Sequence, residues 1–106
     1  MATGFPHENL DCYRLATEIA RWVLGARFPS RCADLTDQAV RASQSVVLNI
    51  AEGAARGGPA GKNHFRIALG SAAELTAVLD LVPLDGAPER QAELRRVGAM
   101  LRGLAR

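Results

Sequence analysis

The sequence predicts an all-α protein, an antiparallel up-down four-helix bundle. Four segments repeat their apolar residues every three or four positions, and Pro or Gly residues separate these segments. Aromatic residues make up only 5% of the chain, and the apolar content is mainly Ala, Leu and Val, a composition that favours packed helices over sheets. At 106 residues, residues 1–106 are expected to form one domain, with residues 1–9 as a flexible N-terminal segment.

The first predicted helix covers about residues 10–26 and ends before Phe28-Pro29, since proline cannot continue a helix. Its apolar stripe consists of Leu10, Tyr13, Ala16, Ile19 or Ala20, Val23 and Leu24. The second predicted helix covers about residues 34–52. Asp34 and Asp37 favour its first turn through the helix dipole, and Gly53 is expected to close it. Its apolar stripe consists of Leu35, Ala39, Ala42, Val46 and Ile50.

Residues 56–61 (Arg-Gly-Gly-Pro-Ala-Gly) have the composition of a loop. The third predicted helix follows at about residues 62–81. Gly70 in its interior costs roughly 1 kcal/mol relative to Ala, so we expect a close helix contact there rather than a ligand seat. The fourth predicted helix covers about residues 89–104, with Pro88 suited to its first position. The stripes of these helices are Phe65, Ala72, Leu75 and Leu79, and then Leu94, Val97, Leu101 and Leu104.

The charge of the chain is nearly balanced. The formal net charge is +2, and Lys62 is the sole lysine among 13 basic residues. Arginine suits bidentate contact with phosphate or carboxylate, although a coding bias toward arginine would produce the same composition. Cys12 and Cys32 match no redox or metal-binding spacing, which favours free thiols in the cytoplasm. The sequence contains neither a signal peptide pattern nor a membrane-spanning stretch, so we expect no membrane association.

The motifs of several enzyme classes are not matched. The segment Gly57–Lys62 differs from a phosphate-binding loop because Arg56 and Asn63 stand where glycine and Ser/Thr are required. An anion at the helix start near Lys62 is an alternative that stays open. The four predicted helices carry glutamates, but no Glu-x-x-His pair for a di-metal site accompanies them. We therefore predict no enzymatic activity, no metal and no cofactor. The glutamates are Glu18, Glu52, Glu74 and Glu93.

A polar stripe follows one face of the second predicted helix, and the third helix offers polar residues at matching spacing. Short polar side chains suit fixed hydrogen bonds between helices or subunits better than they suit a solvated face. A solvated face and a ligand site are the alternatives. The stripe consists of Gln38, Arg41, Ser45, Asn49, Glu52 and Arg56, and the third helix contributes His64, Ser71 and Glu74.

Two blocks carry a family resemblance: residues 38–53 (QAVRASQSVVLNIAEG, followed by Arg56) and residues 65–75 (FRIALGSAAEL). They closely resemble the bacterial four-helix-bundle family first noticed in intervening sequences of large-subunit ribosomal RNA genes, of which Asn-Ile-Ala-Glu-Gly is the hallmark. With the Phe28-Pro29 turn upstream, the resemblance spans about residues 10–82. The family includes the accessory variability determinant of diversity-generating retroelements, a pentameric barrel that binds a reverse transcriptase and nucleic acid.

The resemblance implies a non-catalytic homo-oligomer, expected to be a pentamer, that binds structured RNA or RNA/DNA as partner of a reverse transcriptase. The alternative is a structural oligomer or protein-interaction scaffold with no role in nucleic-acid binding. The expected phosphate contacts are Arg14, Arg21, Arg41 and Arg66. The expected architectural and oligomer residues are Asn49, Glu52, Gly53, Arg56, Gly70, Ser71 and Glu74.

Overall fold

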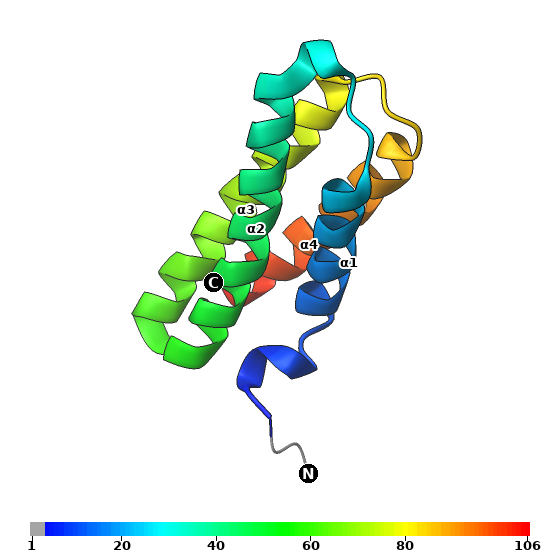
Figure 1. Cartoon of the computed structure of the whole chain (residues 1–106). Helices are drawn as coiled ribbons and strands as arrows, with labels where there is room; N and C mark the ends of the chain where they lie inside the picture. Colours follow the sequence, from blue (N-terminus) through cyan, green and yellow to red (C-terminus); the bar gives the residue numbers. More distant parts are fainter. Residues whose placement is uncertain (1–3) are drawn as a thin grey trace.

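The structure, a computed structural model, describes residues 4–106 and confirms the all-α four-helix bundle. Each long helix runs antiparallel to the one before it (Figure 1). No strand occurs within residues 4–106. The long helices are α1 (Asp11–Gly25), α2 (Ala33–Arg56), α3 (Gly58–Leu81) and α4 (Ala87–Leu104), and the short 3-10 helices are η1 (Pro6–Asn9) and η2 (Ser30–Cys32).

The long helices pack in a closed cycle. Helix α2 contacts α1 and α3, and α4 contacts α3 and α1, whereas α1 and α3 lie on one diagonal and α2 and α4 on the other. The α1–α2 edge and the α3–α4 edge are therefore opposite sides of the bundle. This arrangement decides which surface residues of different helices become neighbours.

The largest fully buried aliphatic side chains of the core come one from each long helix: Ile19, Ile50, Leu75 and Leu101. Burial of such a side chain contributes about 1.5–3 kcal/mol, so the predicted apolar stripes supply the main stabilising term. Leu24 corrects one stripe, because it is 60% exposed. It lies one residue, or about 100° of helix rotation, beyond the buried Val23.

The predicted loop over residues 56–61 is wrong. Helix α2 continues to Arg56, past the predicted end at Gly53, and α3 begins at Gly58. Only Gly57 separates the two helices, with a φ of 63° in the left-handed region that favours glycine. Pro59 lies in the first turn of α3, where its missing N–H costs nothing. The glycines and the proline of this segment thus form a sharp turn between two helices.

Two glycines bring the backbones of α2 and α3 together beside this turn. A Cβ atom built on Gly53 would lie 2.8 Å from the carbonyl oxygen of Gly61, and one built on Gly61 would lie 2.5 Å from that of Gly53. Both glycines are buried. The helices can approach this closely only because neither residue has a side chain.

The expected close contact at Gly70 is wrong. A Cβ built on Gly70 would meet nothing within 4 Å, and the residue is exposed on α3. The small residues that do pack in the core are the neighbouring Ala68 and Ala72. These alanines lie on the buried side of the helix, whereas Gly70 lies on the solvent side.

The chain before α1 is partly ordered, contrary to the expectation of a flexible segment over residues 1–9. Residues 1–3 lie outside the described residues. Helix η1 packs against α1 and α2, and the backbone N–H of Phe5 donates a 2.6 Å hydrogen bond to the Glu8 carboxylate. Among the helices of residues 4–106, none combines the length and the apolar character needed to cross a lipid bilayer.

Candidate functional site

Four side chains form a hydrogen-bonded polar cluster between α2 and α3: Ser45, Asn49, His64 and Ser71. The Ser45 and Ser71 hydroxyl oxygens lie 2.7 Å apart across the two helices. The Asn49 amide nitrogen donates to the Ser45 hydroxyl at 3.1 Å and to the Ser45 carbonyl at 2.9 Å. The His64 Nδ1 lies 2.8 Å from the Asn49 amide oxygen. The polar cluster therefore joins α2 to α3 at two points one helical turn apart.

The direction of these hydrogen bonds determines the histidine tautomer. Because the Asn49 amide nitrogen donates to Ser45, its amide oxygen faces His64 and can only accept. His64 Nδ1 therefore carries a hydrogen and donates it.

Glu52 and Arg56 form an ion pair one turn further along α2. The Arg56 Nε donates to the Glu52 carboxylate at 2.7 Å, and both side chains are about half exposed, 47% for Glu52 and 56% for Arg56. The hydrogen bond and the positive charge of Arg56 lower the pKa of Glu52 below its ordinary value, with a smaller contribution from His64. An exposed pair of this kind contributes little to stability. It orients two charged groups at the end of α2.

The buried polar side chains of this region already have hydrogen-bond partners within the protein. Within residues 4–106, every buried side-chain nitrogen and oxygen has a hydrogen-bond partner. No group of three His, Cys, Asp or Glu side chains in the same residues could hold a metal ion. Cys12 and Cys32 are free thiols, and burial raises the pKa of the Cys12 thiol. The hydrogen bonds of the polar cluster join α2 to α3.

The remaining predicted architectural residues lie in different surroundings, some in a helix contact and others exposed to solvent. Gly53 lies at the backbone contact with α3 described above. Glu74 is exposed on α3 and makes no hydrogen bond within residues 4–106, and Gly70 lies beside it on the solvent side. Gln38 and Arg41 belong to the predicted polar stripe but extend beyond the polar cluster toward the start of α2.

The four predicted phosphate-contact arginines are exposed but lie on three helices. Arg14 and Arg21 share one side of α1, and Arg14 is paired with Asp11 at 3.1 Å. Arg41 lies on α2. Arg66 lies on α3, where it donates a 3.0 Å hydrogen bond to the Ala105 carbonyl at the end of α4. Because α1 and α3 are diagonal in the bundle, these arginines do not form one patch in a single subunit.

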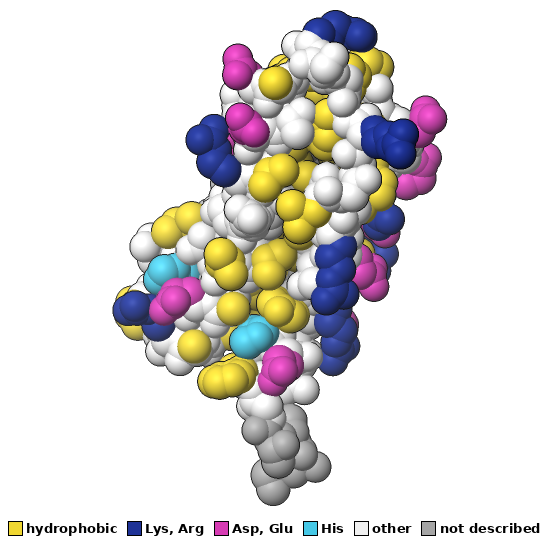
Figure 2. Space-filling model, in the orientation of Figure 1, with side chains coloured by type: hydrophobic (Ala, Val, Ile, Leu, Met, Phe, Trp, Pro, Cys, Tyr) yellow, Lys and Arg dark blue, Asp and Glu magenta, His cyan; other side chains and the backbone are white. Residues whose placement is uncertain are grey.

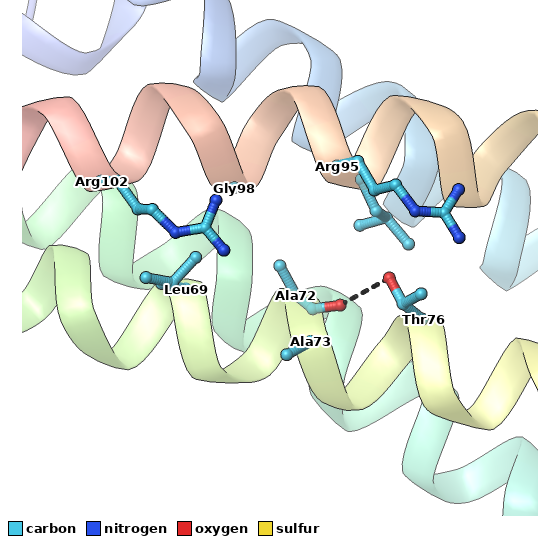
Figure 3. Close-up of a pocket in the computed structure, with 8 residues that line it drawn as sticks. Leu69, Ala72, Ala73, Thr76, Arg95, Gly98 and Arg102 are labelled. Atoms are coloured by element: carbon cyan, nitrogen blue, oxygen red, sulfur yellow. Dashed lines mark hydrogen bonds between the residues drawn. The ribbon is translucent and has the colours of Figure 1, made fainter.

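Sequence reasoning missed a basic strip along the α3–α4 edge. Arg66 of α3 bonds to Ala105 at the end of α4, and Arg95 and Arg102 of α4 line a groove against α3. We include in the strip Lys62, one turn before Arg66 on α3, and Arg106, which follows the end of α4. None of the five forms an ion pair within residues 4–106. Arg95 and Arg102 border a groove of about 250 Å³, and both extend from α4 over it, with Leu69 and Ala73 of α3 below (Figure 3). The signal that could have revealed Arg95 and Arg102 is their spacing of seven residues, which places them on one face of α4.

A second surface is apolar and lies on the opposite edge of the bundle. Leu24 and Leu48 are 60% and 66% exposed there, and they border a groove between α1 and α2. Hydrophobic side chains gather along this line in the space-filling view (Figure 2). We call this the α1–α2 apolar surface; its other lining residues are Thr17, Ala20, Arg21, Gln44 and Val47.

The protein is a small all-helical bundle. Its signature motif builds the α2–α3 helix pair through the polar cluster and the glycine contact beside it. The family model described as 23S rRNA-intervening sequence protein matches residues 8–101. The chain therefore belongs to the 23S rRNA-intervening sequence protein family. A comparison with curated proteins gives no significant match.

Proposed function

We propose that this protein is a non-catalytic, homo-oligomeric accessory protein that binds nucleic acid, with structured RNA as its first candidate ligand. The observation that carries the proposal is that most of the basic side chains form no ion pair. Only three of the 13 basic side chains form an ion pair within residues 4–106. Unpaired arginines can neutralise phosphates without first giving up a carboxylate partner. The family description, which refers to an intervening sequence of 23S rRNA, supports RNA over other polyanions.

Self-association is supported by the α1–α2 apolar surface. Leucines exposed to 60% and 66% in one groove are typical of a protein-protein contact. The pentameric state, a reverse transcriptase as partner and a cytoplasmic location remain parts of the proposal that rest on the family resemblance. In a ring, the surplus charge of each subunit is repeated around the assembly, which raises avidity for a polyanion.

Residue roles in the proposal follow from position. Arg14, Arg21, Arg41 and Arg66 are proposed to contact phosphates, with the strongest geometric support for Arg66 because it adjoins other unpaired cations. The architectural role is assigned to Asn49, Ser71, Gly53 and the Glu52–Arg56 pair. In this role, these residues hold α2 and α3 together while the outer faces of the two helices bind partners.

The proposal is tested by determining the mass of the purified oligomer and titrating it with structured RNA, single-stranded DNA and duplex DNA at two salt concentrations. We expect a mass above that of one subunit and an RNA affinity that falls steeply with salt. Arg41→Glu combined with Arg66→Glu is expected to weaken binding. Absence of RNA binding at low salt would contradict the nucleic-acid role.

A structural oligomer or protein-interaction scaffold is the second candidate function. The observations that favour it are the small net charge of +2 and the α1–α2 apolar surface. An oligomer that keeps its mass but binds none of the three nucleic acids would support this candidate over the first.

A further inference from the structure

We infer that the basic strip along the α3–α4 edge is the main binding site for the phosphate backbone of RNA. The inference rests on the proposed function and deepens it, since it moves the principal contact from the arginines of α1 and α2 to Lys62, Arg66, Arg95, Arg102 and Arg106. Four of these five residues were not apparent as a binding set from the sequence.

The spacing of the strip fits a chain of charges better than a single anion. Arg95 and Arg102 are seven residues apart, which is about 10 Å along the helix axis. Arg66 from the facing helix adjoins the end of α4 through its bond to Ala105. A free phosphate ion can meet one of these cations at a time, whereas an RNA strand presents a phosphate at every nucleotide and can meet several.

The charge around the strip is one-sided. The acidic Glu93 of α4 is paired at 2.8 Å with Arg90, and Arg90 lies over the Trp22 ring of α1, so this pair occupies the opposite flank of α4. Asp80 closes the far end of the groove, where it accepts a 2.7 Å hydrogen bond from Gln91. Between these limits the positive charges of the strip are not offset by a carboxylate of the groove lining.

The groove beneath the arginines is shallow and is floored by small or apolar residues, among them Ala72, Ala73 and Gly98. A floor of this kind presents no carboxylate to the two guanidinium groups, and its Thr76 hydroxyl already donates a hydrogen bond to the Ala72 carbonyl (Figure 3). Each guanidinium offers a planar pair of N–H donors that matches two phosphate oxygens. Arg66 keeps further N–H groups free after its single bond to Ala105.

A contact made by the α1–α2 apolar surface does not cover the strip of the same subunit, because the two edges are on opposite sides of the bundle. Repetition of the subunit would then present several strips to one RNA. In this proposal the α1–α2 apolar surface serves self-association and the basic strip serves ligand binding.

The experiment compares two double variants that remove the same charge from exposed positions. Arg95→Gln with Arg102→Gln neutralises the strip, and Arg27→Gln with Arg31→Gln neutralises the α1–α2 connection, whose arginines are exposed and have no ion pair within residues 4–106. The affinity of the full-length oligomer for a fluorescein-labelled RNA hairpin is measured over a series of salt concentrations. Circular dichroism checks that each variant is folded, and light scattering checks that each keeps the mass of the wild-type oligomer. Arg14→Gln with Arg21→Gln forms a third arm.

We expect the strip variant to lose about tenfold or more in affinity at low salt, and the slope of log affinity against log salt to fall by about two. The Arg27/Arg31 variant should keep the wild-type slope. Equal losses in both variants, or a larger loss for the Arg14/Arg21 variant, would overturn the assignment of the strip while leaving nucleic-acid binding intact. If the wild-type protein does not bind the hairpin at low salt, the proposed function fails and the strip has no such role.

Discussion

The polar cluster shows how single residues of the signature motif act. Asn49 is the central member because its one side chain bonds to Ser45 in its own helix and to His64 in α3. An amide can do this because it carries a donor and an acceptor on opposite atoms. Leucine, valine or lysine at this position would leave His64 without an acceptor.

Asn49→Ala is expected to lower the free energy of unfolding by about 1–3 kcal/mol, since it leaves half-buried partners without hydrogen bonds. Chemical denaturation followed by circular dichroism measures the change. Asn63→Ala is the matched control, because Asn63 is exposed on α3 and makes no hydrogen bond within residues 4–106. Equal stability of the two variants would show that the polar cluster does not hold α2 to α3.

The sequence predicted the participation of Ser45, Asn49 and Ser71 in hydrogen bonds between helices from their spacing and short polar side chains. The prediction named His64 on the facing helix but could not pair it with Asn49 in particular. His64 is 15 residues away from Asn49, and its approach depends on the single-residue turn at Gly57. For the same reason, helical spacing alone could not show that Glu74 lies apart from the cluster.

At the scale of elements, the apolar period predicted all four long helices, because a buried stripe is visible in the order of residues alone. The connection between α2 and α3 was predicted wrongly for a physical reason. Gly and Pro are common in loops, but they are also the residues that a sharp helix-to-helix turn requires, with Gly57 in the left-handed region and Pro59 in a first turn. Composition does not distinguish these two uses.

Two glycine substitutions are expected to have opposite effects. Gly53→Ala should lower the unfolding free energy by about 1–3 kcal/mol, because its Cβ would press on the Gly61 carbonyl at 2.8 Å. Gly70→Ala should raise it by about 0.5–1 kcal/mol, because the new methyl group meets open space in a helix interior. Thermal and urea unfolding of both variants measure these shifts. A Gly53→Ala variant as stable as the wild type would contradict the backbone contact between α2 and α3.

At the scale of the whole molecule, the cyclic packing separates an apolar edge from a basic edge. The α1–α2 apolar surface and the basic strip lie on opposite sides because α1 pairs with α2 and α3 pairs with α4. A different order of the same helices would place these residues in other neighbourhoods. The division is therefore a property of the tertiary structure.

Leu48→Glu is expected to lower the mass of the oligomer measured by light scattering, because a buried carboxylate in an apolar contact is costly. Leu81→Glu is the matched control, since the two leucines are 66% and 67% exposed but lie on different helices. Both variants should remain helical by circular dichroism. An unchanged mass for Leu48→Glu would place the subunit contact elsewhere.

The sequence by itself determined the fold class, the four long helices and most of their buried faces, because these depend on the spacing of apolar residues within one segment. It also determined the family, through the motif around Asn49 and Glu52. Only the tertiary structure decided that Gly57 alone joins α2 to α3, that His64 reaches Asn49, and that Arg66 meets the end of α4 while Arg95 and Arg102 border the groove between α3 and α4. These features join residues from different helices, and their neighbourhoods exist only once the helices have packed.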